Sequence, residues 1–213
     1  MLLPGLEDGL KMFIYHDWDF IRAVHESLYD LQDRELDDME ETMLIRKSKT
    51  EDFEAILAIV NDAAQAYRGV IPDDRWHEPY MPAEELRSEI ADGVVFWVIE
   101  DEGCMVGVMG LQDKGEVALV RHAYVETKLQ RIGIGTSLLR HVEGLTDKPI
   151  LIGTWTAASW AIDFYRRNGF TVVSNSEKDR LLHTYWSIPV RQIEESVVLA
   201  DRRWIAAQSK GTT

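Results

Sequence analysis

The sequence is poor in cysteine, and this restricts both its stabilising chemistry and its expected compartment. Among 213 residues there is one cysteine, Cys104, so no disulfide can form within the chain. Chains without disulfides are typical of reducing compartments. Residues 1–4 also lack the basic leader and long apolar stretch of a secretory signal. The sequence therefore predicts a cytoplasmic protein.

Long apolar runs and basic residues are also scarce. The run at 94–99 has six apolar residues, whereas a membrane-spanning helix needs about 20. The 23 basic side chains face 37 acidic ones, giving a net charge of −14, which repels phosphate backbones and anionic lipid. The six histidines and the acids show no spacing of metal ligands. We expect no nucleic-acid partner, no membrane partner and no metal.

The acidic residues are concentrated at the N-terminus. Residues 1–42 hold twelve acids and three bases, which leaves a net charge of −5 for the rest of the chain. Within this stretch apolar residues recur at three- and four-residue spacing, which predicts an amphipathic helix over 18–36 with Asp17 as N-cap. The face opposite the stripe is either a solvated surface or a contact with a partner, such as a second copy in a homodimer. We therefore divide the chain into an acidic helical extension, 1–42, and a domain, 43–213.

From Met43 onward strands and helices alternate. Thr50 is the expected N-cap of the first helix. The segment 67–82, which has three prolines, is a long loop or a broken helix, and 174–192 is a long link. Predicted strands cover 43–46, 94–100, 105–111, 116–125, 150–155, 170–173 and 196–199, and predicted helices cover 53–60, 83–91, 133–143 and 159–168. This order predicts an α/β domain with one mixed sheet.

The most informative segment is the glycine-containing turn that follows the strand 116–125. The first turn of a helix leaves backbone N–H groups unpaired, and glycine lets an anion approach them. A dinucleotide-binding fingerprint would need glycine or alanine where Leu138 stands, and a P-loop would need a lysine after the glycine. The residues alone leave two alternatives, a phosphate-binding turn and a helix start without a ligand.

Two motifs resemble the GNAT acyltransferase superfamily. The pattern Gln130-x-x-Gly133-x-Gly135 is similar to its acyl-CoA signature, and Tyr165-x-x-x-Gly169-Phe170 is similar to its second landmark helix. The resemblance covers about residues 43–200 and implies a single, largely antiparallel mixed sheet flanked by helices. It also implies transfer of an acetyl group from acetyl-CoA to a primary amine of a small molecule, amino acid or peptide.

The resemblance assigns roles to matching residues. It implies that the strand before the signature carries a bulge and separates from the next strand, opening a cleft for pantetheine. Tyr165 matches the tyrosine that protonates the departing thiolate, a role that suits a phenol with a pKa of about 10. The residues implied to bind the coenzyme are Ala123, Tyr124 and Val125 at the strand end, and Gln130, Arg131, Ile132, Gly133, Ile134, Gly135 and Thr136 around the pyrophosphate. Charge near the 3′-phosphate is implied for Arg121, Arg131 and Lys128.

The sequence departs from the family pattern at two positions. Leu119 stands where many relatives have a glutamate, so no general base is assigned, and Ala158 stands where many have an asparagine. The remaining candidates are His122, Glu116, His77 and Glu78 for the base and Ser159 and Thr156 for the pantetheine contact. These departures motivate an alternative function, a non-catalytic acyl-CoA-binding module. A third alternative is a nucleotide-binding α/β protein.

The acceptor is the least determined substrate. The resemblance implies that the loop 67–80 covers the acceptor side, where its aromatic residues either wall a pocket or pack in the core. Arg68 and Arg75 favour a substrate carboxylate, whereas the acidic surface favours a cationic amine. The sequence leaves both alternatives open.

Overall fold

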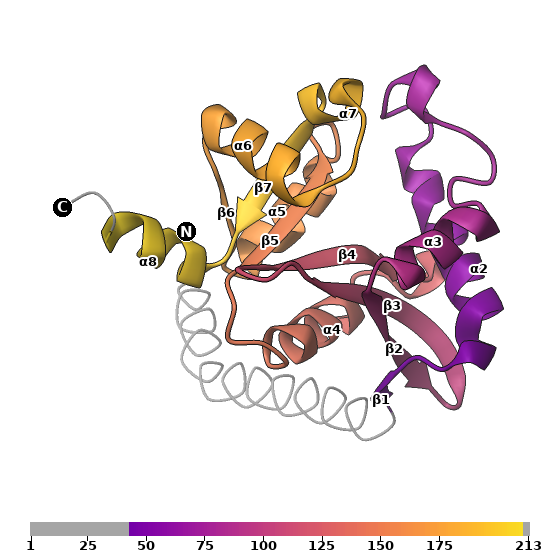
Figure 1. Ribbon diagram of the computed structural model, residues 1–213. Coiled ribbons are helices and arrows are strands. Elements are labelled where there is room, and N and C mark those ends of the chain that lie inside the picture. The colour runs from indigo at the N-terminus through magenta and orange to yellow at the C-terminus, as the bar shows by residue number, and fades with distance from the viewer. Residues whose placement is uncertain (1–42, 211–213) are drawn as a thin grey trace, which may run out of the picture. The chain divides into compact units, whose positions relative to one another are not determined.

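The computed structural model describes residues 43–210, which build one mixed sheet covered by helices (Figure 1). The predicted helix at 18–36, its cap and the rest of the extension 1–42 lie outside the described residues. The sheet has the spatial order β1-β2-β3-β4-β5-β7-β6. Its strands are β1 Met43–Lys47, β2 Val94–Asp101, β3 Cys104–Asp113, β4 Ala118–Val125, β5 Ile150–Trp155, β6 Thr171–Val172 and β7 Ser196–Ala200. Neighbours from β2 to β4 and from β5 to β6 pair antiparallel, and β4 and β5 pair parallel, which confirms the largely antiparallel mixed sheet.

Most of the predicted helices are present, and two regions differ. The helices are α2 Phe53–Ala64, α3 Ala83–Ala91, α4 Ile134–Glu143, α5 Ser159–Arg167, α6 Asn175–Tyr185, α7 Val190–Glu194 and α8 Arg202–Lys210. The prediction of a link at 174–192 is wrong, because α6 and α7 lie there. Thr50 is not the cap of α2, because a 3-10 turn, Thr50–Asp52, precedes the helix and Asp52 occupies the cap position. In that turn the Asp52 carboxylate accepts a hydrogen bond from the Lys49 backbone N–H at 2.6 Å.

The alternation of side chains along β2 divides the helices between the two faces of the sheet. Phe96 and Val98 pack in a buried cluster with residues of α2 and α3. Trp97 points the other way, and its ring centroid lies 4.6 Å from that of His141 on α4. Adjacent strand residues face opposite sides, so α4 covers the face opposite α2 and α3 (Figure 1).

A second core lies under the C-terminal half of the sheet. The buried side chains Leu181 and Leu182 of α6 and Ile193 of α7 pack against strands β5 and β7. Lys178 is buried on the same helix, and its ammonium donates a hydrogen bond to the Ile193 carbonyl at 3.0 Å, which ties α6 to α7. No helix in the part of the chain described by the structure is long and apolar enough to cross a membrane.

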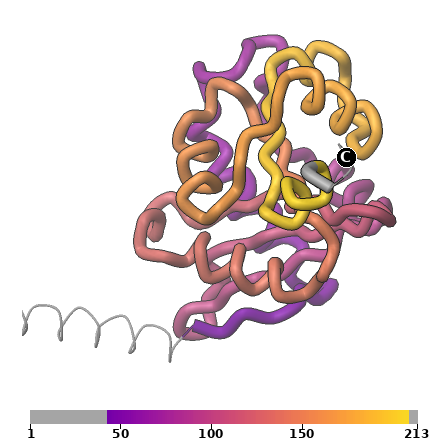
Figure 2. The backbone as a smooth tube through the Cα atoms, turned by 90° about the vertical axis from the view of Figure 1, so that its left-hand side faces the viewer, coloured from indigo at the N-terminus to yellow at the C-terminus, as the bar shows by residue number. Residues whose placement is uncertain are grey.

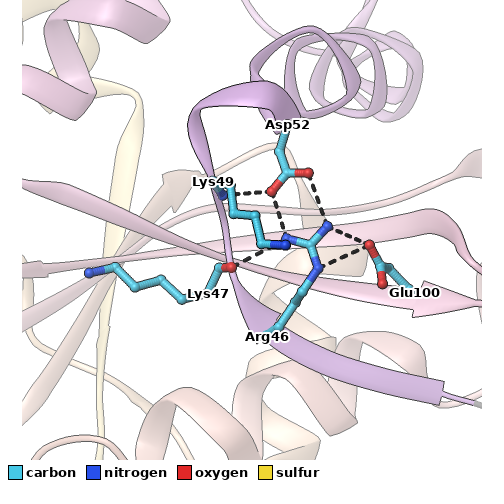
Figure 3. A network of polar contacts seen from close by, with 5 residues as sticks. All are labelled: Arg46, Lys47, Lys49, Asp52 and Glu100. Atoms are coloured by element: carbon cyan, nitrogen blue, oxygen red, sulfur yellow. Dashed lines mark hydrogen bonds and ion pairs between the residues drawn. The ribbon is translucent and has the colours of Figure 1, made fainter.

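An ion-pair network fastens the first strand to its neighbours (Figure 3). The Arg46 guanidinium donates to Asp52 at 2.6 and 3.0 Å and pairs with Glu100 of β2. Hydrogen bonding to Arg46 lowers the pKa of Asp52 to about 2, so this carboxylate remains ionised well below neutral pH. The network stabilises the edge of the sheet on the side of β1.

Candidate active site

Strands β4 and β5 are paired along only part of their length. Their register covers Ala118, Leu119 and Val120 opposite residues 150–152. Beyond these pairs β4 continues for five residues, to Val125, and β5 for three, to Trp155. In the described chain no strand residue pairs with this end of β4 on its β5 side. The backbone edge from residue 121 to 125 is therefore available to a ligand.

A β-bulge re-aims the unpaired end of β4. Gly110 pairs with Arg121 and Val108 with Tyr124, so two residues of β4, His122 and Ala123, oppose one residue of β3. His122 has a left-handed backbone, with φ +50°. A Cβ on Gly110 would lie 2.9 Å from the Arg121 carbonyl oxygen, so the bulge needs glycine on the neighbouring strand. The bulge that the family resemblance implies is present.

The turn between β4 and α4 is held by contacts at both ends. The backbone N–H of Glu126 donates to the Val106 carbonyl at 2.9 Å, and that of Thr127 donates to the Asp62 carboxylate on α2 at 2.8 Å. The side chain of Gln130 donates to the Val125 carbonyl at 3.2 Å. Gln130 thus ties the turn to the end of the strand, a positioning role that does not require it to touch a ligand.

The start of α4 presents a row of unpaired backbone donors. Gly133 is its N-cap with φ +98°, and Arg131 also has a positive φ, +71°. The N–H groups of Thr136 and Ser137 donate to the Gly133 carbonyl, whereas those from 131 to 135 have no acceptor within residues 43–210. Unpaired N–H groups at a helix N-terminus attract anions through their partial positive charge. We call residues 131–135 the cradle; its unpaired donors suit an anion such as a phosphate group.

The cradle lies against both the strand end and α5. A Cβ built on Gly135 would be 3.8 Å from a Val125 methyl group and 3.4 Å from the Phe164 ring. The next residue on α5 is Tyr165, whose ring packs edge-on against those of Phe164 and Phe170. The structure therefore brings three predicted features together: the strand end, the glycine turn and Tyr165.

Tyr165 is buried, but its hydroxyl is not used in packing. The residue is 7% exposed, and burial raises the pKa of the phenol above its usual value of 10.0. No residue of the described chain hydrogen-bonds the hydroxyl, and its oxygen atom is not fully buried. The phenol therefore remains protonated at neutral pH, and its O–H group can donate to a group that enters the cleft.

Three further tyrosines gather beside Tyr165, and we call the four the tyrosine cluster: Tyr67, Tyr80, Tyr124 and Tyr165. The rings of Tyr67 and Tyr80 stack with centroids 5.7 Å apart. Burial raises the pKa of Tyr67 to about 12, and it raises that of Tyr124 well above 10, with added effects of the neighbouring tyrosines. The loop 67–80, α5 and the bulged strand β4 together build a site of low polarity.

The candidate bases are dispersed. Leu119 is fully buried in the core beside α6, so no acidic group stands at its position. Glu116 precedes β4 at the end away from the cleft, where its carboxylate accepts a hydrogen bond from Tyr185 at 3.3 Å. His77 and Glu78 are exposed, and the His77 Nδ1 lies 2.7 Å from the Pro79 carbonyl oxygen. Of the four candidates, only His122 lies on the bulge.

His122 and Arg121 belong to a polar network with α3. The guanidinium of Arg121 donates to Glu89 at 2.5 Å and to the Gln112 side chain at 3.1 Å, and the His122 Nε2 lies 3.4 Å from the second Glu89 oxygen. His122 also stacks on Phe96, with ring centroids 5.8 Å apart. The network lies on the α3 face, opposite α4, so Arg121 does not contribute charge near the cradle.

Two other basic residues remain beside the cradle. Lys128 is exposed, and its ammonium lies 3.0 Å from the Glu126 carboxylate. Arg131 is exposed within the turn itself. At the start of α5, Ala158 is fully buried, whereas Ser159 and Thr156 are exposed.

A pocket of about 360 Å³ opens next to the tyrosine cluster. It is lined by the loop that follows α2 and by Glu195, which follows α7. The loop after α2 and helix α7 lie side by side in both views (Figures 1 and 2). Its wall includes Trp155, whose indole N–H donates to the Tyr80 hydroxyl at 3.4 Å. The lining residues are Val70, Ile71, Pro72, Asp73, Trp155, Ala157 and Glu195.

The two arginines expected to bind a substrate carboxylate do not line this pocket. The Arg75 guanidinium lies 3.4 Å from Asp74, and that of Arg68 lies 4.0 Å from Glu78. Sequence reasoning also missed residues that shape the site, among them Glu89, Asp62 and Glu195. Nothing in their local sequence marks them, because their partners lie on other elements.

Comparisons with known proteins identify the fold. Residues 56–185 match the family model described as acetyltransferase (GNAT) domain. The PaiA N-acetyltransferase from Thermoplasma acidophilum, solved in complex with coenzyme A, is 19% identical with a TM-score of 0.57, covering 75% of this chain and 98% of its own. The ribosomal-protein-S18-alanine N-acetyltransferase from Escherichia coli is 17% identical with a TM-score of 0.53, covering 75% of this chain and 92% of its own. No curated protein sequence matches the chain.

Proposed function

Because the chain belongs to the GNAT acetyltransferase family, we propose that it transfers an acetyl group from acetyl-CoA directly to a primary amine of a small molecule, amino acid or peptide. The observation that carries this proposal is the juxtaposition of the cradle, the unpaired end of β4 and the free hydroxyl of Tyr165. The similar PaiA N-acetyltransferase was solved in complex with coenzyme A, which supports an acyl-CoA donor.

The cradle is the part of the chain suited to the pyrophosphate. Five successive N–H groups, from residue 131 to 135, are without an acceptor in the described chain. A hydrogen bond to a charged oxygen contributes about 1.5–3 kcal/mol, so three or four of these donors would hold the diphosphate despite the acidic surface. The Thr136 N–H already donates to the Gly133 carbonyl. Thr136 therefore lies beside the cradle but does not supply a backbone donor to the pyrophosphate.

The end of β4 is suited to the pantetheine arm. Ala123, Tyr124 and Val125 lie beyond the last residue of β4 that pairs with β5, at and after the bulge. Gln130 holds the Val125 carbonyl and so fixes the angle between this strand end and the turn. The residues together orient the donor for attack by a bound amine.

The chemical step needs a proton donor for the sulfur, and Tyr165 is proposed for this role. The amine nitrogen bonds to the carbonyl carbon, the carbon–sulfur bond breaks, and the nitrogen loses a proton to solvent. The phenol protonates the departing thiolate and afterwards recovers a proton from solvent. The raised pKa keeps Tyr165 protonated before the reaction, and its hydroxyl has no competing partner in the described chain. No covalent intermediate with the protein is involved, because the exposed Cys104 lies at the start of β3, in the β2–β3 hairpin.

Two measurements test this function. Titration calorimetry with acetyl-CoA should show saturable binding, and thiol release should require an added amine. Binding together with amine-dependent release supports catalysis; the absence of saturable binding refutes the proposal.

The second candidate is a domain that binds acyl-CoA without turning it over. It is favoured by the burial of Leu119 in the core, since a water-accessible base is missing at that position. Binding without thiol release across amino acids, polyamines, aminoglycosides and basic peptides supports this candidate over the enzyme.

A further inference from the structure

The pocket beside the tyrosine cluster has carboxylates as its only charged groups within the described lining. Asp73 comes from the loop after α2, and Glu195 follows α7. The other lining residues, which include Ile71 and Trp155, are of apolar or aromatic types. At about 360 Å³ it lies near the lower end of ligand pockets, which span about 300–1,000 Å³. Its size suits a small molecule, its apolar side chains suit an aliphatic part, and its two carboxylates suit a positive charge.

The negative charge of the pocket is only weakly compensated. Asp73 makes no ion pair and no side-chain hydrogen bond within residues 43–210. The Glu195 carboxylate lies 3.7 Å from Arg191, but the same guanidinium nitrogen lies 3.8 Å from Glu194. One exposed arginine therefore serves two glutamates, and the pocket retains a net attraction for cations.

A carboxylate on the acceptor would be disfavoured here. Arg68 and Arg75, which could have paired with it, lie against Glu78 and Asp74 and do not reach the pocket lining. A free amino acid in the pocket would therefore place its carboxylate near like charges with no cation to bind it. The charge of the lining therefore favours a cationic amine over an acceptor with a carboxylate.

A nitrogen bound by these carboxylates would not be the one that reacts. Neighbouring negative charge stabilises an ammonium ion, whereas the nucleophile must be a neutral amine. The tyrosine cluster offers the opposite environment, because its buried phenols form a surface of low polarity that disfavours charge. Trp155 belongs to the pocket wall and also donates to Tyr80 of the cluster, so the two environments adjoin.

Building on the proposed acetyl transfer, we propose that the acceptor is a small aliphatic amine with a second, protonated nitrogen, which Asp73 and Glu195 bind. Its methylene chain lies along Ile71 and Trp155, and its neutral amine reacts beside the tyrosine cluster. The new carbon–nitrogen bond replaces the carbon–sulfur bond, the nitrogen loses its proton to solvent, and the sulfur takes one from Tyr165.

The test compares three acceptors of similar length: 1,4-diaminobutane, butylamine and 4-aminobutanoate. Thiol release is followed at saturating acetyl-CoA. We expect kcat/KM for the diamine to exceed that for butylamine by about tenfold, which corresponds to about 1.4 kcal/mol, and 4-aminobutanoate to be the poorest. Equal rates for the diamine and butylamine, or preference for 4-aminobutanoate, would overturn the proposal.

Variants assign the effect to the pocket. Asp73→Asn and Glu195→Gln should each raise KM for the diamine by about threefold to fivefold, the size expected of an exposed ion pair, and reduce its advantage over butylamine. Asp74→Asn is the matched control, because Asp74 is a sequence neighbour of Asp73 outside the pocket lining. An equal change in this control variant would contradict the assignment.

Failure of this inference is distinguishable from failure of the proposed function. If butylamine and 4-aminobutanoate are acetylated at the same rate as the diamine, the proposed function stands and the proposed acceptor class is wrong. If no amine is acetylated, the proposed function fails, and calorimetry with the coenzyme A-loaded protein still tests the pocket. In that case tighter binding of the diamine than of butylamine, weakened by Asp73→Asn, supports the pocket assignment, and equal affinities overturn it.

Discussion

Replacing Tyr165 with phenylalanine separates the chemistry of its hydroxyl from the packing of its ring. The ring is 7% exposed and contacts Phe164 and Phe170, and these contacts remain in Tyr165→Phe. The hydroxyl has no hydrogen-bond partner in the described chain, so its removal leaves no donor or acceptor unpaired. We therefore expect the free energy of unfolding to change by less than about 0.5 kcal/mol.

The expected loss of activity is much larger. Positioned proton transfer contributes about 10²–10⁴-fold to a rate, so kcat should fall by at least about 100-fold, or about 2.7 kcal/mol. The affinity for acetyl-CoA should remain within about threefold, because the cradle donors belong to residues 131–135 and not to α5.

The pH dependence gives a second readout. Burial raises the pKa of Tyr165 above 10.0, so the phenol keeps its proton as the pH rises through the ordinary tyrosine range. The wild-type kcat should therefore not decline between pH 8 and about pH 10 through loss of this proton. The assay is thiol release at saturating substrates, with calorimetry for the donor and urea unfolding for stability. A variant that keeps kcat within threefold of wild type would refute the role of the hydroxyl.

Three further predictions concern the cradle and its support. Gly133→Ala places a side chain at φ +98°, so it should cost about 1–2 kcal/mol of stability and weaken acetyl-CoA binding in calorimetry; unchanged affinity would contradict the cradle. Glu89→Gln leaves the half-buried Arg121 without its ion partner and should lower the urea-unfolding free energy by about 2–3 kcal/mol, whereas a neutral effect would show the pair to be dispensable. Hydrogen bonding from Arg46 lowers the pKa of Asp52 from 3.8 to about 2, so the ionised carboxylate contributes up to about 2 kcal/mol above pH 4 that is lost as the pH falls toward 2. Asp52→Asn should remove this part of the acid sensitivity in unfolding titrations, and an unchanged slope between pH 4 and pH 2 would count against the network.

Local signals predicted most of the sheet and the cradle. The β2–β3 hairpin follows from two apolar runs around Gly103, and α4 begins where Gly133 permits a left-handed backbone. These features depend on the conformational preferences of neighbouring residues, which the sequence displays directly.

The parts that were missed depend on contacts between distant residues. Helix α6 carries only a few apolar residues, and Lys178 reaches the Ile193 carbonyl across the α6–α7 pair, so its pattern resembles a polar link. Arg121 was expected near a phosphate, but Glu89 on α3 holds it on the other face. The members of the tyrosine cluster come from separate elements, and no spacing along the chain predicts that they lie close together.

The division of helices between the two faces of the sheet has a kinetic consequence. The cradle belongs to α4 on one face of the sheet, whereas the pocket is built by loops next to α2 and α7 on the other. With acetyl-CoA in the cradle and the amine in the pocket, as proposed above, the two reactants enter from opposite faces, and neither has to leave before the other arrives. Initial-velocity plots at several fixed concentrations of the second reactant should give intersecting lines, as expected when both are held at once.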